Sequence, residues 1–119
     1  ITYKKLLRRT IGEKKRNYHN KLIKDDYGNP IRDLSINKIT HLSNTIIIVD
    51  EAHHLIDNDY GMALQKILNN PDSVNLKLVL LTATPMNNTA KDIVYLMNLL
   101  LDKKDKLDMY KIFKKVFSF

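Results

Sequence analysis

The feature that most constrains this chain is an unbroken apolar run from Thr45 to Val49, which leads directly into two carboxylates, Asp50 and Glu51. Four of the five residues are β-branched aliphatics, so the run predicts a strand buried on both faces, as in a parallel sheet. Ligands of open α/β sheets bind beyond the carboxyl ends of such strands. Adjacent carboxylates repel each other and lose solvation there, so the pair indicates a cation site or a reaction site.

The chemistry that suits these two carboxylates is hydrolysis of a nucleoside triphosphate. Asp50 would hold Mg²⁺, directly or through water, and Glu51 would orient and deprotonate the attacking water. The alternative interpretation is an ordinary strand followed by an acidic loop, because short motifs also occur by chance.

A second strand is predicted at residues 76–81, and the turn Thr82-Ala83-Thr84 leaves its end. Between the two strands, residues 60–68 have helical periodicity, with an apolar face formed by Met62, Leu64, Ile67 and Leu68. A strand–helix–strand unit of the right-handed type brings both strand ends to one edge of the sheet. We therefore expect Asp50, Glu51 and Thr82 to face one cleft.

Two ordered motifs carry a family resemblance. Asp50-Glu51-Ala52-His53 resembles the DEAH form of motif II in superfamily 2 helicases and nucleic-acid translocases. Thr82-Ala83-Thr84 resembles motif III, the element that links the ATP site of those proteins to their nucleic-acid site. The run 84–100 is similar to the chromatin-remodeller pattern, with Asn87, Asp92 and Leu99 where that pattern has Gln, Glu and Phe.

The resemblance implies an α/β fold, namely the later half of a RecA-like helicase lobe 1 with a parallel sheet and flanking helices. It implies ATP and Mg²⁺ as cofactors, bound through Asp50 and Glu51, and a hydrogen bond from His53 to motif III that couples nucleotide state to nucleic-acid grip. The partner would be DNA or RNA. The motifs look most like helicases of large cytoplasmic DNA viruses, of the poxvirus early transcription factor small subunit and nucleoside triphosphate phosphohydrolase type, which adds a viral RNA polymerase as an expected partner.

Two other classes of protein fit part of this pattern. One is a non-catalytic, helicase-like module that binds nucleic acid or a polymerase within a transcription factor. The other is the Walker B strand of a different P-loop class, such as the AAA+ ATPases. That class explains Asp50 and Glu51 but leaves His53 and the motif III run as coincidence.

The chain contains neither the Gly-Lys-Thr/Ser phosphate loop nor the motif VI arginines of such helicases. Its glycines are Gly12, Gly28 and Gly61, and none precedes a Lys-Ser/Thr pair. We therefore expect residues 1–119 to be a fragment of helicase lobe 1, with the P-loop and the second lobe elsewhere in the parent chain. Its expected parts are a basic segment and insertion (1–44), a motif II to motif III core (45–101) and a C-terminal helix (102–119).

Basic charge is concentrated at the N-terminal end. Residues 1–24 hold nine Lys or Arg and one acid, a net charge of +8, whereas residues 25–119 carry a net charge of −1. Such a concentration is typical of a polyanionic partner. The predicted nucleic-acid contacts are Thr2, Lys4, Lys14, Lys15 and Arg16, with Tyr18 placed to stack on a base. A solvated charged face is the alternative.

The remaining local predictions concern the chain around the two motifs. Residues 1–9 fit either a strand end or a helix start, and Asp25 to Pro30 is a turn within a hairpin-like excursion. Asp33 or Ser35 would cap a short helical turn. Helices are predicted at 90–101, capped by Asn88 or Thr89 with an apolar stripe of Ile93, Leu96, Met97 and Leu100, and at 108–117.

The chain has no cysteine and no apolar run near the length that spans a bilayer. Absence of disulfides fits an intracellular protein, located in the virion or host cytoplasm if it is viral, and we expect no membrane partner.

Overall fold

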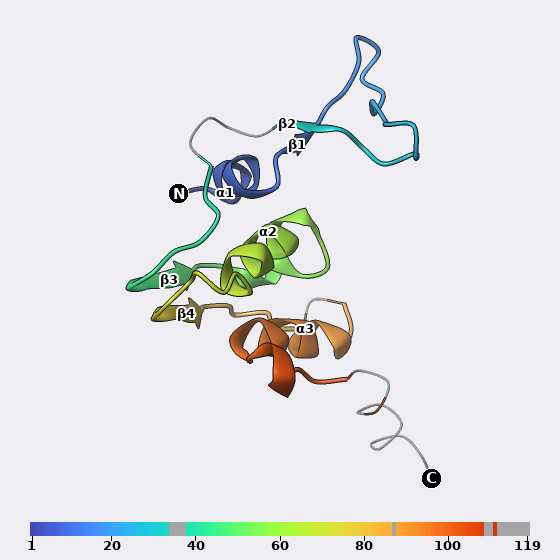
Figure 1. The fold of residues 1–119 in the computed structure, drawn as a ribbon. Coiled ribbons are helices and arrows are strands. Elements are labelled where there is room, and N and C mark those ends of the chain that lie inside the picture. The colour runs from blue at the N-terminus through green and yellow to red at the C-terminus, as the bar shows by residue number, and fades with distance from the viewer. Residues whose placement is uncertain (34–37, 87, 109–110, 112–119) are drawn as a thin grey trace.

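The computed structural model describes residues 1–33, 38–86, 88–108 and 111. Its elements, in chain order, are α1 (Tyr3–Thr10), β1 (Glu13–Lys14), β2 (Arg32–Asp33), β3 (Thr45–Val49), η1 (Ala52–Leu55), α2 (Asp59–Leu68), β4 (Leu76–Leu80), α3 (Lys91–Leu100) and η2 (Lys103–Asp105) (Figure 1). Ser35 and most of the helix predicted at 108–117 lie outside the described residues. None of the described helices is both long and apolar enough to cross a membrane.

Strands β3 and β4 form a parallel pair with α2 as the connection between them. Thr45 pairs with Leu76 and Val49 with Leu80, so the two strands are in register along their full length. β4 ends one residue before its predicted end, although the Leu81 amide still donates to the Val49 carbonyl at 2.9 Å. The predicted α/β fold, a parallel sheet flanked by helices, is confirmed.

Among the described residues, only one face of this sheet is covered. The inward side chain of Val49 is 8 % exposed, whereas Ile46 and Ile48 are each 65 % exposed. The prediction that β3 is buried on both faces is wrong for the described chain, because the described core packs on the face that carries Ile47 and Val49. The continuous apolar run is typical of a strand buried on both faces, but in the structure every second residue of β3 is exposed.

The core lies between that face and helices α2 and α3. It is formed by Val49, Ala52, Leu55, Leu64, Leu96 and Leu99. The carboxamide of Asn58 begins α2 by accepting hydrogen bonds from the amides of Tyr60 and Gly61, at 3.0 and 3.1 Å.

The predicted apolar face of α2 is correct except for Met62. The residues that α2 buries are Gly61, Ala63, Leu64 and Ile67. Met62 is 47 % exposed because it lies two positions from Leu64, about 200° around a helix of 3.6 residues per turn.

Helix α3 turns a different face inward from the one predicted. It buries Val94, Leu96 and Leu99, whereas the exposed fractions of Ile93, Met97 and Leu100 are 37, 45 and 53 %. The stripe prediction is therefore wrong for three of its four residues. Apolar side chains occupy most of the circumference of α3, so periodicity alone does not select the buried face.

The predicted capping of α3 by Asn88 or Thr89 is also wrong. The capping group lies inside the helix: the Asp92 carboxylate accepts hydrogen bonds from the amides of Asn88 at 2.7 Å and Thr89 at 3.3 Å. A carboxylate in the first turn satisfies free amides there and is favoured by the helix dipole.

The N-terminal residues form a helix rather than a strand end. The Thr2 hydroxyl caps α1 by accepting from the Lys5 amide at 3.2 Å. The helix stops at Gly12, whose φ of +82° lies in the left-handed region and whose amide donates to the Leu7 carbonyl at 2.9 Å. Leu7 and Thr10 are the buried residues of α1, which packs against α2.

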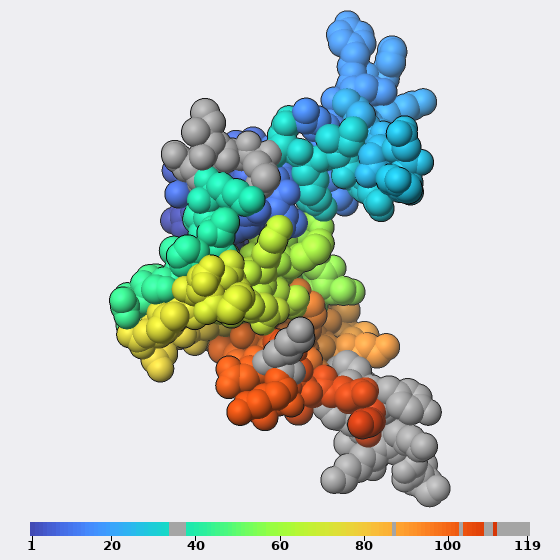
Figure 2. Space-filling view, in the orientation of Figure 1, coloured from blue at the N-terminus to red at the C-terminus, as the bar shows by residue number. Residues whose placement is uncertain are grey.

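The excursion between α1 and β3 is a three-armed module, residues 13–33. Its stem is the antiparallel pair β1 and β2, and its other two arms are hairpins at residues 16–22 (arm 1) and 24–30 (arm 2). The module projects from the body of the molecule (Figures 1 and 2). The predicted hairpin-like excursion is therefore confirmed, with the predicted turn at Asp25 to Pro30 in arm 2, and arm 1 is a second hairpin that the sequence analysis did not predict.

Candidate functional site

The candidate site is at the carboxyl ends of β3 and β4. Asp50 directly follows β3, and Thr82 comes two residues after the end of β4. The Ala52 amide donates to the Leu81 carbonyl at 2.9 Å, which fixes the turn after β3 against the end of β4. Because Ala52 is completely buried, this junction is part of the core rather than a loose loop.

Glu51 has an unusual backbone conformation. Its φ and ψ of 51° and 50° are left-handed, which costs a non-glycine residue on the order of 1 kcal/mol. Two hydrogen bonds hold the turn: the Glu51 amide donates to Asp50 Oδ1 at 2.9 Å, and the His54 amide donates to the Glu51 carbonyl at 3.0 Å. Such outliers persist where the surrounding structure fixes them, and they cluster at functional sites.

The imidazole of His54 lies beside the Glu51 carboxylate, with Nε2 3.4 Å from Oε2. The His54 ring also contacts the ring of His53, with centroids 4.3 Å apart. The Glu51 side chain remains mostly exposed, so it is accessible to a water molecule and has a neighbouring group that can orient it.

His53 connects the two strand ends. Its Nδ1 lies 3.1 Å from the hydroxyl oxygen of Thr82, and the same oxygen accepts from the Thr84 amide at 3.1 Å. A hydroxyl has one hydrogen and two lone pairs, so it satisfies both contacts with either tautomer of His53. The hydrogen bond that the resemblance implies between motif II and motif III is therefore present. Ala83, between the two threonines, is exposed.

Tyr3 is a site residue that the sequence did not indicate. Its hydroxyl donates to the main-chain carbonyl of Asp50 and to that of Glu51, the latter at 3.2 Å. Its ring packs against Tyr60 and edge-on against His54, with centroids 5.7 and 5.9 Å away. Burial, then the nearby charges of Asp50 and Glu51, raises the pKa of the Tyr3 hydroxyl, so it is a donor at neutral pH.

The donor set suits a magnesium ion that arrives with a nucleotide. Asp50 uses one carboxylate oxygen for the Glu51 amide, and its other oxygen has no hydrogen bond among the described residues. Mg²⁺ is commonly held by one or two carboxylates together with phosphates and water. No cluster of three metal-ligating side chains occurs in the described part of the chain. A protein-only metal cage is therefore not the arrangement seen here.

The predicted nucleic-acid residues near the N-terminus have partners within the chain. Thr2 caps α1, and Lys4 lies 3.8 Å from the carboxylate of Glu13. Their role as nucleic-acid contacts stays a prediction.

The predicted cluster Lys14, Lys15 and Arg16 is likewise divided. Lys14 contacts Asp59 at 3.6 Å, Lys15 contacts Asp33 at 3.1 Å, and the Arg16 guanidinium donates to the Asn20 carbonyl at 3.0 Å. Neighbouring residues of an extended chain point to opposite sides, which separates Lys14 from Lys15.

Sequence reasoning also missed His54 and Asp59. The i, i+3 spacing of Glu51 and His54 is a usable signal, because a helical turn places such residues together. Asp59 had no local signal, since Lys14 and Arg32, its two partners, are far from it in the sequence. For Tyr3, no signal in the sequence placed it against motif II.

The parallel strand pair, with its two motifs at one end, is the arrangement of a fragment of a RecA-like helicase lobe. The family model described as "DEAD/DEAH box helicase" matches residues 4–93, and the chain belongs to that family.

Two relatives come from Acanthamoeba polyphaga mimivirus. "Putative ATP-dependent RNA helicase L377" is 41 % identical over 120 residues, which is 95 % of this chain and 10 % of that protein. "Putative ATP-dependent RNA helicase R563" is 39 % identical over 71 residues, or 57 % of this chain and 12 % of that protein. The chain thus spans about a tenth of the length of the curated relatives it matches. No solved structure matches it.

These comparisons support the helicase family and a similarity to helicases of a large virus. The relatives are mimivirus proteins, and their names specify RNA. The DEAH-type and poxvirus-type assignments stay predictions, as does the assignment to DNA.

Proposed function

We propose that this chain is part of the ATPase engine of an RNA-dependent helicase or translocase. The observation that carries the proposal is the hydrogen bond between His53 and Thr82, which joins the carboxylate motif to the Thr-Ala-Thr motif at one sheet edge. The names of the two mimivirus relatives add ATP and RNA as the expected nucleotide and nucleic acid. A role in viral transcription, with a polymerase as partner, stays a prediction from the resemblance.

In this proposal each residue of the edge has its own task. Asp50 would hold Mg²⁺ with its free carboxylate oxygen, and Mg²⁺-ATP supplies the phosphoryl group to be hydrolysed. Glu51 would accept the proton of the attacking water, with His54 orienting its carboxylate. Tyr3 would hold the backbone of both acidic residues in place.

Coupling to the nucleic acid would pass through motif III. Thr82 binds His53 on one side and the Thr84 amide on the other, so a shift of the 82–84 turn moves a contact of the carboxylate motif. A coupling of this kind makes ATP turnover depend on nucleic acid, and nucleic-acid affinity depend on nucleotide.

One lateral edge of β3 has no strand partner in the part of the chain that the structure describes, which supports the proposal that the chain is part of a larger lobe. A cavity of about 610 Å³ runs along that edge, between β3 and the start of α1, and reaches Asp50. Its lining is largely apolar and includes Ile1, Leu6, Ile46 and Ile48. The lateral edge of β3 suits a further strand of the same sheet. The phosphate loop would follow the carboxyl end of that strand, at the same end of the sheet as Asp50.

The test is ATP hydrolysis by the full-length protein with and without RNA or DNA. We expect RNA to stimulate turnover, and Glu51→Gln to lower it by at least about a hundredfold, the contribution typical of a general base. The matched control is Asp72→Asn, in the turn before β4 at the opposite end of the sheet. A wild-type protein that binds RNA but hydrolyses no ATP would contradict the proposal and favour the non-catalytic transcription module.

A further inference from the structure

The three-armed module of residues 13–33 is built on an eight-residue repeat. The segments Lys15-Arg16-Asn17, Ile23-Lys24-Asp25 and Ile31-Arg32-Asp33 each place a base before an Asn or Asp. Their first residues form a closed triangle of backbone hydrogen bonds, from Lys15 to Ile31 at 2.8 Å, Ile31 to Ile23 at 2.9 Å and Ile23 to Lys15 at 3.0 Å. The junction of the three arms is therefore fixed by the backbone.

Arms 1 and 2 have the same turn. In arm 1, Asn17 Oδ1 accepts hydrogen bonds from the amides of His19 at 2.9 Å and Lys21 at 3.0 Å. In arm 2, Asp25 Oδ1 accepts from the amides two and four residues later, each at 2.9 Å. Each turn also has a left-handed residue at the equivalent position, Asn20 or Gly28. Both tips are thus ordered locally, without a core.

The two tips have opposite charge. Arm 1 carries Arg16 and Lys21 with no acid, and its Tyr18 is 99 % exposed. Arm 2 carries two adjacent acids, Asp25 and Asp26, against a single base, and its Tyr27 is 90 % exposed. Each tip therefore displays an aromatic ring, but only arm 1 combines that ring with positive charge.

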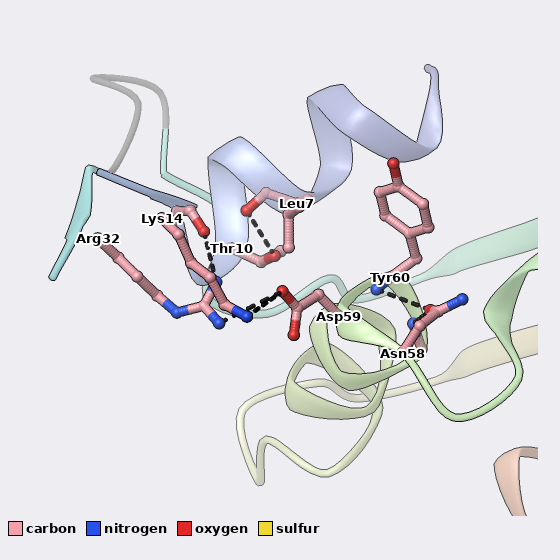
Figure 3. A network of polar contacts seen from close by, with 9 residues as sticks. Leu7, Thr10, Lys14, Arg32, Asn58, Asp59 and Tyr60 are labelled. Carbon is pink, nitrogen blue, oxygen red and sulfur yellow. Dashed lines mark hydrogen bonds and ion pairs between the residues drawn. The ribbon is translucent and has the colours of Figure 1, made fainter. Parts of the chain in front are cut away.

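The stem holds the module in place and leaves arm 1 directed outward. Asp59 of α2 contacts Lys14 at 3.6 Å and Arg32 at 3.4 Å (Figure 3). Glu13 lies 2.9 Å from the Arg8 guanidinium. Acids of the chain itself thus pair with the bases of the stem. Lys21 at the tip forms no ion pair within the described residues, and the arms project away from the body (Figure 2).

We propose that the tip of arm 1 is a binding site for single-stranded nucleic acid. Tyr18 stacks on an unpaired base, while Arg16 and Lys21 contact the flanking phosphates. The rings of Tyr18 and His19 are perpendicular, with centroids 5.5 Å apart and planes at 86°, and because Tyr18 is 99 % exposed its ring is open for stacking. This inference rests on the proposed function, which makes nucleic acid the substrate, and adds where it is held and in which form.

Arm 2 provides the argument for a polyanionic partner. A surface that binds proteins through exposed aromatic rings would use both tips, because both rings are equally open. A nucleic acid distinguishes them, since its phosphates are attracted by arm 1 and repelled by Asp25 and Asp26. The backbone match between the arms makes arm 2 an internal control for arm 1.

The experiment measures binding of labelled oligouridylate of about 15 nucleotides to the full-length protein by fluorescence anisotropy. We expect Tyr18→Ala to raise Kd about tenfold, the loss of one stacked base, and Tyr18→Phe to bind like the wild type. Tyr27→Ala is the matched control and should change Kd less than about twofold. Lys21→Ala should reduce the salt dependence of log K by about 0.7, the value for one phosphate of a single strand.

Equal affinities of Tyr18→Ala, Tyr27→Ala and the wild type would overturn the arm 1 site. The arm 1 site would also be overturned if Tyr18→Ala lost as much affinity for a base-paired RNA of the same length as for oligouridylate, because a duplex has no free base for Tyr18 to stack on. If RNA stimulates ATP turnover of the wild-type protein but Tyr18→Ala binds RNA as tightly as the wild type, the arm 1 site is refuted and the proposed function is not. A wild-type protein that binds no RNA at all would refute the proposed function as well.

Discussion

The two regions of this molecule reach a fixed structure by different means. The core of residues 45–100 is organised by burial, with Ala52, Leu55 and Leu64 completely removed from solvent. The module of residues 13–33 buries none of its side chains and relies on backbone hydrogen bonds and two Asn/Asp turns. The difference matches the tasks we assign. Chemistry requires carboxylates fixed on a rigid edge, whereas a contact surface requires exposed rings and charges.

The largest effect that separates the two regions is expected at glycines. A Cβ at Gly61 of α2 would meet the Tyr95 hydroxyl at 2.1 Å and the Leu55 carbonyl at 2.2 Å, and the backbone partner cannot rotate away. We expect Gly61→Ala to lower the free energy of unfolding by about 3 kcal/mol, as overpacked cores do. Urea unfolding followed by circular dichroism measures it.

Gly28 of arm 2 is the matched glycine of the module. A Cβ there meets nothing within 4 Å, and only its φ of +81° opposes a side chain. Gly28→Ala should therefore cost about 1 kcal/mol, and the cost should stay within the module. Equal losses for Gly61→Ala and Gly28→Ala would break the distinction between a packed core and a module without one.

A smaller effect is expected at Asp59, which joins the two regions. Asp59→Asn removes the partner of Lys14 and Arg32, two ion pairs whose side chains are about one third exposed and which together contribute about 1 kcal/mol. The module should loosen while the core stays folded, so trypsin should cut at Lys21 and Lys24 faster than in the wild type. Asp26→Asn, at the tip of arm 2, is the control. Unchanged cleavage would show that the module does not need this anchor.

The smallest effect concerns alkaline pH. Burial raises the pKa of Tyr3 and of Tyr95, and the charges of Asp50 and Asp57 add to the rise. The unfolded chain then ionises first, so stability is fully present below a pH of about 10 and falls as pH rises through the folded-state pKa values.

The double substitution Tyr3→Phe and Tyr95→Phe should flatten this alkaline loss, measured as the urea midpoint at a series of pH values. The double substitution Tyr18→Phe and Tyr27→Phe, outside the core, controls for the removal of two phenol groups. A wild-type midpoint that is constant above a pH of about 10 would contradict the burial of the two core hydroxyls.

The sequence predicted what local pattern determines. The run at 45–49, the helix at 60–68 and the second strand follow from apolar residues at regular spacing, and the structure confirms them. The pairing of His53 with Thr82 followed from the resemblance. The buried face of α3 was missed because apolar residues surround that helix, and the exposed face of β3 because composition does not show which sheet face is covered.

Contacts between distant residues account for the rest. Tyr3 reaches the carbonyls of Asp50 and Glu51 across 47 and 48 residues, and no pattern near Tyr3 announces them. The three-armed form of the module was missed for a different reason. Its eight-residue repeat consists mainly of polar and turn residues, so a search based on apolar periodicity does not find it.

The most direct test of this account is a double-mutant cycle on the bond between His53 and Thr82 in the full-length protein. The measured quantity is the stimulation of ATP turnover by RNA in His53→Ala, Thr82→Val and the combined variant. If the bond couples the two motifs, each single substitution lowers stimulation about tenfold and the combination lowers it no further. Independent losses that multiply in the combined variant, or full stimulation in either single variant, would contradict the account.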